Sequence, residues 1–227
     1  MSAGDEPAAA RQAMLEVIRR EVRWHGAGDG ARELDPRVLD ALGKVPRERF
    51  VPPGQQAFAY ENRPLPIGHD QTISQPLVVA MMTHLLRVEP ESRVLEIGTG
   101  CGYQTAILAE LARTVVSIEI LAPLAERARA TLDELGYRNV ELKVGDGAAG
   151  WPALAPYDRI LVTAAPGAVP GALLEQLKPR GRMIIPLGAD RAAQDLALIE
   201  KDEAGRVSER RLFPVAFVPL TGGNPGA

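Results

Sequence analysis

The chain has 227 residues, of which 46% are hydrophobic and 24% charged, and its formal net charge is −3. This composition is typical of a globular protein with a full core, and it lacks the basic surplus of nucleic-acid-binding proteins. The one cysteine, Cys101, excludes an internal disulfide and fits a reducing compartment, which we expect to be the cytoplasm. The three histidines are scattered, so no metal-ligand spacing arises.

The N-terminal part combines a polar start with two predicted helices. Residues 1–10 are small, acidic and rich in alanine, so we expect them to be disordered, and they lack the apolar stretch of a signal peptide. Residues 12–24 are predicted to be helical because apolar residues recur there at a spacing of four. Asp35 and Pro36 are typical first residues of a second helix. No apolar run approaches the length of a membrane span, so no membrane partner is expected.

Prolines interrupt the stretch that follows. Residues 45–60 are therefore predicted to be irregular, and residues 61–70 to form a loop. Ser74 stands two residues before Pro76, a pattern that predicts a helix running to about Leu86 with Ser74 as its N-cap. That interpretation gives Ser74 a structural role only, and a chemical role stays open at this point.

The stretch RVLEIGTGCGYQTA, residues 93–106, predicts a strand, a tight turn and a helix. Three glycines occupy alternate positions of the turn: Gly98, Gly100 and Gly102. A dinucleotide-binding turn would need its third glycine where this chain has Tyr103. Glu96, just before the turn, disfavours a pyrophosphate and suits a ligand with a cationic amino-acid end. S-adenosylmethionine is such a ligand, so the stretch favours a methyltransferase over an NAD-dependent enzyme.

From residue 93 onward, strands and helices alternate in the sequence. Strands are predicted at residues 94–97, 115–119, 140–144, 159–163 and 182–187, and helices at 102–112, 123–135 and 170–177. Two further strand-like runs, residues 196–200 and 212–220, flank a polar turn and indicate an antiparallel hairpin.

The predicted fold class is α/β, with a doubly wound, mostly parallel sheet of the S-adenosylmethionine-dependent methyltransferase type, which is Rossmann-like. An N-terminal helical extension and a C-terminal antiparallel hairpin complete it. We expect one domain over residues 11–227. Its residues 11–90 contain the helical part and a substrate loop, and residues 91–227 form the cofactor-binding core.

Acidic residues follow three successive predicted strands. Glu96 ends the first, Glu119 ends the second, and Asp146 follows the third between two glycines. Ligands of open parallel sheets bind at the carboxyl ends of the strands, so these side chains are expected to meet at one site. Glu119 is suited to accept the ribose hydroxyls and Asp146 to reach the adenine amino group. Cys101 has no basic neighbour in the sequence to activate it, so we interpret it as a small residue that fits the turn.

The chain resembles the protein-L-isoaspartate O-methyltransferases from about residue 32 to residue 222. The matching pieces include VPRERFVP, LPIGHDQTISQP, VLEIGTGCGYQTA, GDG, LKPRGRMIIPLG and FVPLTG. LPIGHDQTISQP is the most specific, because it lies outside the generic cofactor fold. The resemblance implies repair of aged proteins: S-adenosylmethionine methylates the α-carboxylate of an L-isoaspartyl residue, and the ester collapses to a succinimide on the way back to aspartyl.

The resemblance also implies roles for individual residues. Ser74 matches the active-site serine, whose role would be to orient the substrate carboxylate. The implied cofactor contacts are Gln71, Thr72, Ile73, Glu96, Gly98, Gly100, Gly102, Glu119, Asp146 and Gly147. The implied substrate contacts are Ile73, Ser74, Val218 and Thr221. The family further implies that the last two strands are swapped relative to the usual methyltransferase sheet, which the sequence cannot show.

The chain departs from the family pattern at a few positions. His69 and Asp70 stand where bacterial members commonly have an aromatic residue and glycine, Cys101 where serine is common, and Arg180 where glycine is common. Only the first pair lies on the substrate side, so peptide preference is the property most affected.

The chemistry implied by the resemblance needs no general base, because a carboxylate is already ionised at pH 7. Alternatives remain: a methyltransferase acting on another carboxylate or a small molecule, a non-enzymatic family member that binds the cofactor, or an NAD-dependent enzyme. The expected partners are isoaspartyl-containing proteins and peptides, and we expect a monomer.

Overall fold

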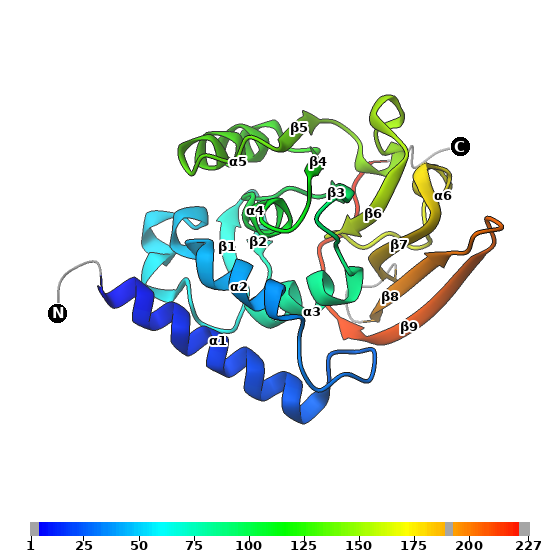
Figure 1. The fold of residues 1–227 in the computed structure, drawn as a ribbon. Coiled ribbons are helices and arrows are strands. Elements are labelled where there is room, and N and C mark those ends of the chain that lie inside the picture. The colour runs from blue at the N-terminus through cyan, green and yellow to red at the C-terminus, as the bar shows by residue number, and fades with distance from the viewer. Residues whose placement is uncertain (1–4, 189–192, 223–227) are drawn as a thin grey trace.

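A seven-stranded sheet organises the part of the chain that follows residue 92, within the residues that the structure describes, 5–188 and 193–222 (Figure 1). The structure is a computed structural model. The first five strands are parallel and the last two antiparallel. This confirms the predicted α/β class with its C-terminal antiparallel strands. In spatial order the strands are β5 (Val140–Val144), β4 (Thr114–Glu119), β3 (Arg93–Ile97), β6 (Tyr157–Val162), β7 (Leu177–Leu187), β8 (Gln194–Lys201) and β9 (Val207–Val215).

Helices cover both faces of this sheet. One face carries α3 (Pro76–Leu86), α4 (Tyr103–Ala109) and α5 (Ala122–Glu134), and the other carries the short α6 (Gly171–Gln176). Side chains of a strand alternate between faces, so in β3 Val94 and Glu96 face α4 while Leu95 and Ile97 face α6. Both faces of β3 are buried, as expected for a central parallel strand.

The N-terminal helices pack on one side of the sheet domain, next to α3 (Figure 1). They are α1 (Asp5–His25) and α2 (Pro36–Lys44), and Asp35 caps α2 as predicted by accepting from the Arg37 amide. The predicted disorder of residues 1–10 is wrong for residues 5–10, which are helical, and residues 1–4 lie outside the described residues. Alanine has the highest helix propensity, and proline is tolerated in a first turn, so this composition extends the helix.

A short hairpin replaces much of the loop predicted at residues 61–70. Strands β1 (Leu65–Gly68) and β2 (Gln71–Ile73) pair antiparallel, and His69 and Asp70 form the turn with positive φ angles of 54° and 57°. The alternating burial of β1 explains the strand, although prolines obscure it in the sequence. Upstream lie two 3-10 helices, η1 (Arg47–Phe50) and η2 (Pro53–Phe58), followed downstream by η3 (Gly147–Ala149) and η4 (Pro152–Leu154).

Other corrections concern where elements begin and end. Helix α3 begins at Pro76 with Gln75 as its N-cap residue, so the prediction that Ser74 caps it is wrong. Helix α4 ends three residues early, at Ala109. The last strand spans residues 207–215 rather than 212–220, because its partner β8 begins at Gln194, opposite Val215. The final two strands follow in chain order, a point that the sequence left open.

Candidate active site

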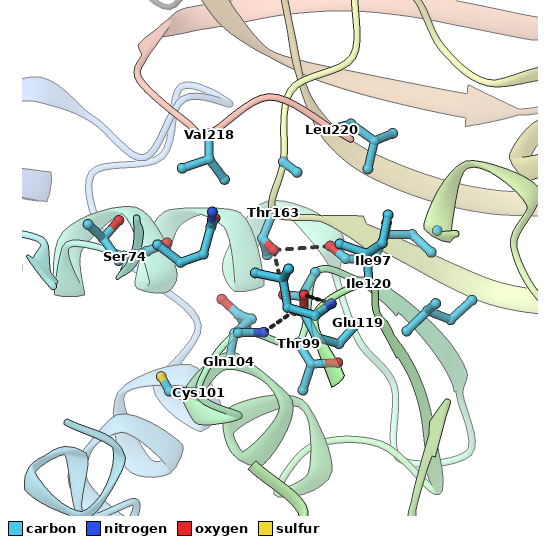
Figure 2. A pocket seen from close by; sticks show the side chains of 18 of the residues that line it. Ser74, Ile97, Thr99, Cys101, Gln104, Glu119, Ile120, Thr163, Val218 and Leu220 are labelled. Atoms are coloured by element: carbon cyan, nitrogen blue, oxygen red, sulfur yellow. Dashed lines mark hydrogen bonds between the residues drawn. The ribbon is translucent and has the colours of Figure 1, made fainter. Parts of the chain in front are cut away.

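A cleft opens at the carboxyl ends of β3, β4 and β6, bordered by the hairpin strand β2 and by residues 218–221 (Figure 2). Figure 2 shows Ser74 and Glu119 on opposite sides of it, with Val218 and Leu220 projecting toward them from the C-terminal segment. Most of the predicted site residues line this cleft: Gln71, Thr72, Ile73, Ser74, Gly98, Gly100, Glu119, Gly147, Val218 and Thr221. Among the described residues, the wall does not include Glu96, Gly102 or Asp146.

The glycine turn after β3 forms the floor of the cleft. Gly98 has a φ of +90°, and a Cβ there would lie 2.4 Å from Thr163 Oγ1. That hydroxyl donates to the Gly98 carbonyl at 2.6 Å, so close packing and backbone conformation both require glycine. Gly102 also has a φ of +90°, but its missing Cβ makes room for Ala128 of α5. Gly102 therefore serves helix packing in this structure and does not line the cleft.

Glu119, at the end of β4, ties the glycine turn to the neighbouring strand. Its Oε2 accepts from the Gly100 amide at 2.7 Å, and its Oε1 accepts from the Leu121 amide at 3.0 Å. The side chain is only 6% exposed and lines the cleft. Each carboxylate oxygen retains further acceptor capacity, so the group is held in place with acceptors still available to a ligand.

Glu96 lies beneath the turn, between the sheet and α4. Its Oε2 accepts from the hydroxyls of Thr105 on α4, at 2.5 Å, and Ser117 on β4, at 2.6 Å. Burial raises the pKa of this carboxyl to about 7, against the lowering effect of the two hydroxyls. Its Oε1 is buried and has no hydrogen-bond partner among the described residues. A chain of hydroxyls connects it to the cleft, since Ser117 Oγ lies 2.6 Å from Oγ1 of Thr99, which lines the wall.

Asp146 sits at the end of β5, outside the wall of the cleft. Its Oδ1 accepts from the Ala148 amide at 2.8 Å and caps η3. Gly222 approaches it so closely that a Cβ there would lie 2.3 Å from Oδ1. The neighbouring Gly147 does line the cleft.

The Gln71–Ile73 strand and Ser74 form the side of the cleft opposite Glu119. Ile73 is buried, and Ser74 is partly exposed. The Ser74 carbonyl accepts from Nη2 of Arg47 at 2.7 Å. Its hydroxyl makes no hydrogen bond to any residue in 5–188 or 193–222, so it is free to meet a ligand in the cleft.

The C-terminal segment reaches the cleft by pairing with the loop after β6. The Ala165 amide donates to the Val218 carbonyl at 2.8 Å, and the Leu220 amide donates to the Ala165 carbonyl at 2.9 Å. This short parallel bridge fixes Val218 and Leu220 above the glycine turn (Figure 2). Residues far apart in the sequence thereby converge on one site.

The wall also contains residues that sequence reasoning missed. Thr163 follows β6, so the strand-end rule that selected the three acids could have found it. Ile120, directly after Glu119, lines the cleft and is 40% exposed, and an exposed apolar residue beside a strand-end acid is a usable signal. Thr99, Gln104 and Leu220 gave no sequence signal of their own. Cys101 lines the wall, and burial raises the pKa of its thiol, which agrees with its interpretation as an inert small residue.

The donor and acceptor groups of the cleft fit S-adenosylmethionine. The glycine turn offers close approach to backbone, and Glu119 offers acceptors for hydroxyls. No described helix is both long and apolar enough to cross a membrane. The described acidic, histidine and cysteine side chains form no group of three placed to hold a metal ion. Fold and cleft together define a methyltransferase-type α/β protein.

Comparisons with known proteins identify the family. Residues 29–225 match the family described as protein-L-isoaspartate(D-aspartate) O-methyltransferase. The chain is 56% identical over 225 residues to protein-L-isoaspartate O-methyltransferase 2 of Syntrophobacter fumaroxidans, covering 99% of this chain and 91% of that protein. It is also 56% identical over 209 residues to protein-L-isoaspartate O-methyltransferase 2 of a Polaromonas species, covering 92% and 99%.

Solved structures agree. A protein-L-isoaspartate O-methyltransferase structure is similar with a TM-score of 0.81 and 28% identity, covering 95% of this chain and 67% of that one. A Plasmodium falciparum protein described as a member of the same class, in complex with S-adenosyl-L-homocysteine, has a TM-score of 0.78 and 24% identity, covering 93% and 98%. The chain belongs to the protein-L-isoaspartate(D-aspartate) O-methyltransferase family.

Proposed function

We propose that this chain transfers a methyl group from S-adenosyl-L-methionine to the α-carboxylate of L-isoaspartyl residues in aged or damaged proteins. The resulting ester collapses to a succinimide and leads back to aspartyl. One observation carries the proposal: the QTIS segment, which lies outside the cofactor fold, forms the same cleft as the glycine turn and Glu119. Relatives that match nearly the whole chain bear the same name.

Several residues are suited to hold the cofactor. The backbone of Gly98 and Gly100 would face its amino-acid part, Glu119 the ribose hydroxyls, and Ile120 a flat apolar ring. When bound, S-adenosylmethionine supplies an electrophilic methyl group on a sulfonium. Glu96 and Asp146 stay outside the wall, so we propose that Glu96 acts through the Thr99 and Ser117 hydroxyls. For Asp146 and Gly102, direct contact with the cofactor remains a prediction.

The proposed reaction requires the protein to align the substrate carboxylate with the methyl donor rather than to transfer a proton. An α-carboxylate has a reference pKa near 3.3–3.7 and is ionised at neutral pH. Such a nucleophile carries no proton that a general base would have to remove, and Glu119, the carboxylate in the described wall, is bound by two backbone amides. Ser74 donates its free hydroxyl to the substrate carboxylate, and Val218 and Thr221 hold the flanking peptide. Holding the reactants in line can supply several kcal/mol, up to about 7–11 in ideal cases.

Peptide pairs that differ only in isoaspartate or aspartate test the proposal. In isoaspartate the free carboxylate lies on Cα, whereas in aspartate it lies one methylene further from the backbone. Misplacement by about 1 Å can slow such a transfer about a hundredfold, so we expect kcat/KM to favour the isoaspartyl peptide at least to that extent. Methylation of both peptides at similar rates would remove the repair assignment. Methylation of neither peptide would leave the alternative, a methyltransferase for a different carboxylate or a small molecule.

We further propose that the enzyme works as a monomer in the cytoplasm. The unpaired, buried thiol of Cys101 is compatible with a reducing compartment. Size-exclusion chromatography with light scattering, at the concentration used for the assay, tests the monomer. A dimer that stays intact on dilution would contradict it.

A further inference from the structure

Arg47 is a fully buried cation behind the Ser74 side of the cleft. Its side chain is 0% exposed, although arginine is rarely buried without a partner. Its Nε donates to the Ala59 carbonyl at 2.7 Å, and its Nη2 donates to the Ser74 carbonyl at 2.7 Å. No carboxylate among the described residues lies within ion-pair distance of it. Its Nη1 is buried and has no hydrogen-bond partner among the described residues. Burying an unpaired charge is costly, so core packing alone does not explain an arginine at this position.

The same guanidinium also packs on the helix that follows the glycine turn. Its Cζ lies 4.7 Å from the centre of the Tyr103 ring. The Tyr103 ring in turn makes an edge-to-face contact with Phe50, with the ring centres 5.6 Å apart. Tyr103 is the first residue of α4 and lines the cleft. Arg47 therefore joins the backbone of Ser74 to the start of α4, which means that it links the proposed substrate side to the proposed cofactor side.

The geometry depends on the shape of the guanidinium. Two carbonyls from different segments accept from different nitrogens while the flat face covers an aromatic ring. A lysine ammonium has the charge but neither the planar fork nor the face. An apolar side chain of similar length would fill the volume and leave the Ser74 and Ala59 carbonyls without this donor.

We propose that Arg47 is a positioning residue that fixes the Ser74 loop relative to α4, so that the Ser74 hydroxyl and the glycine turn stay aligned for methyl transfer. This inference rests on the proposed function. Arg47 does not line the cleft and is not expected to touch either substrate. Because alignment errors of about 1 Å can slow transfer about a hundredfold, a small loop displacement is enough to be measured.

The test compares Arg47→Met and Arg47→Lys with Arg182→Met. Arg182 is a control, since it also donates to a backbone carbonyl, that of Leu85, although it additionally pairs with Glu200, and it lies at the end of the sheet opposite the cleft. For Arg47→Met we expect kcat on the isoaspartyl peptide to fall at least tenfold, while the Kd for S-adenosyl-L-homocysteine by calorimetry changes less than threefold. For Arg47→Lys we expect an intermediate loss of kcat. Arg182→Met should lower the melting temperature and leave kcat within twofold.

Three results would overturn the proposal: wild-type kcat in Arg47→Lys, equal losses of kcat in Arg47→Met and Arg182→Met, or a loss of cofactor-product affinity as large as the loss of kcat. If Arg47→Met does not fold, the lysine variant decides alone. Hydrogen exchange supplies a readout without turnover, because amides of residues 71–75 should exchange faster in both Arg47 variants and not in Arg182→Met. Unchanged exchange in those amides would contradict positioning, whereas a wild-type enzyme inactive on isoaspartyl peptides would contradict the proposed function instead.

Discussion

At the scale of single residues, the strand-end acids illustrate what a sequence pattern can and cannot decide. The pattern located Glu119 and Glu96 at the ends of neighbouring strands, where Glu119 is the last residue of β4 and Glu96 the last but one of β3. It could not decide which one faces the ligand, because successive side chains of a strand point to opposite faces. The pleat of β3 turns Glu96 toward α4, where Thr105 and Ser117 bind it. Glu119 instead sits at the last position of its strand and reaches the turn.

The buried Glu96 predicts a specific pH dependence of stability. Its pKa is raised to about 7 from an ordinary value of 4.5, mainly because burial disfavours the charged form. Between those pH values the folded state keeps a proton that the unfolded state has lost. The unfolding free energy should therefore fall as pH rises, by at most about 1.4 kcal/mol per pH unit from this group.

Glu96→Gln should reduce that fall, because the amide does not titrate. Urea unfolding of both proteins without ligand at pH 5, 6 and 7 measures the difference. The wild type should lose stability relative to the variant across this range. Identical pH profiles for the two proteins would mean that burial does not raise the pKa of Glu96.

At the scale of elements, the hairpin β1–β2 could not be predicted from the sequence because of its prolines and its unusual turn. His69 and Asp70 both have positive φ, a conformation that favours glycine or asparagine in two-residue hairpin turns. The family's common glycine at the second position suits this turn, and the chain carries Asp70 instead. The departure therefore affects both the backbone conformation and the charge beside Gln71, which lines the cleft.

Two variants of Asp70 separate these effects. We expect the wild type to favour peptides with a basic residue after the isoaspartate, and both Asp70→Asn and Asp70→Gly to flatten that bias, since each removes the charge. Asp70→Gly should raise stability more than Asp70→Asn does, by up to about 1 kcal/mol, because glycine adopts the left-handed conformation without the cost that a Cβ brings, although it loses extra chain entropy on folding. Ratios of kcat/KM for lysine- and serine-flanked peptides, at low and high salt, measure the bias. A bias that survives in Asp70→Asn would assign it to another group.

At the scale of the whole molecule, the α/β order was predictable because three of the parallel strands, β3, β4 and β6, are short apolar runs followed by a helix-forming segment. The convergence on one cleft was also predictable, since strand ends of an open sheet meet at one edge. The path of the C-terminal segment was not. Its residues alternate like a strand, but β8 is too short to pair beyond Val215, so the chain leaves the sheet edge and returns to Ala165. That return depends on tertiary contacts that no local pattern contains.

Gln194 is one of those contacts. It is 3% exposed, its Oε1 accepts from the Phe217 amide at 2.7 Å, and its Nε2 donates to the Phe217 carbonyl at 3.1 Å. The side-chain amide thus replaces a neighbouring strand at the point where the segment leaves β9. Phe217 packs in the core beside it, and Val218 in the cleft follows directly.

Gln194→Met keeps the side-chain length but removes both hydrogen bonds, so buried backbone groups of Phe217 lose their partners. We expect a loss of about 1–3 kcal/mol in unfolding free energy. Since Val218 and Thr221 are proposed to hold the peptide, KM for the isoaspartyl peptide should rise at least threefold, while the Kd for S-adenosyl-L-homocysteine stays within twofold. Gln176→Met is the matched control, because Gln176 makes the same pair of bonds, to the Trp151 amide and the Ala149 carbonyl. It should destabilise the protein similarly without raising KM. If both affinities weaken equally in Gln194→Met, the C-terminal segment encloses the cofactor as well as the peptide, and its assignment to the substrate alone is wrong.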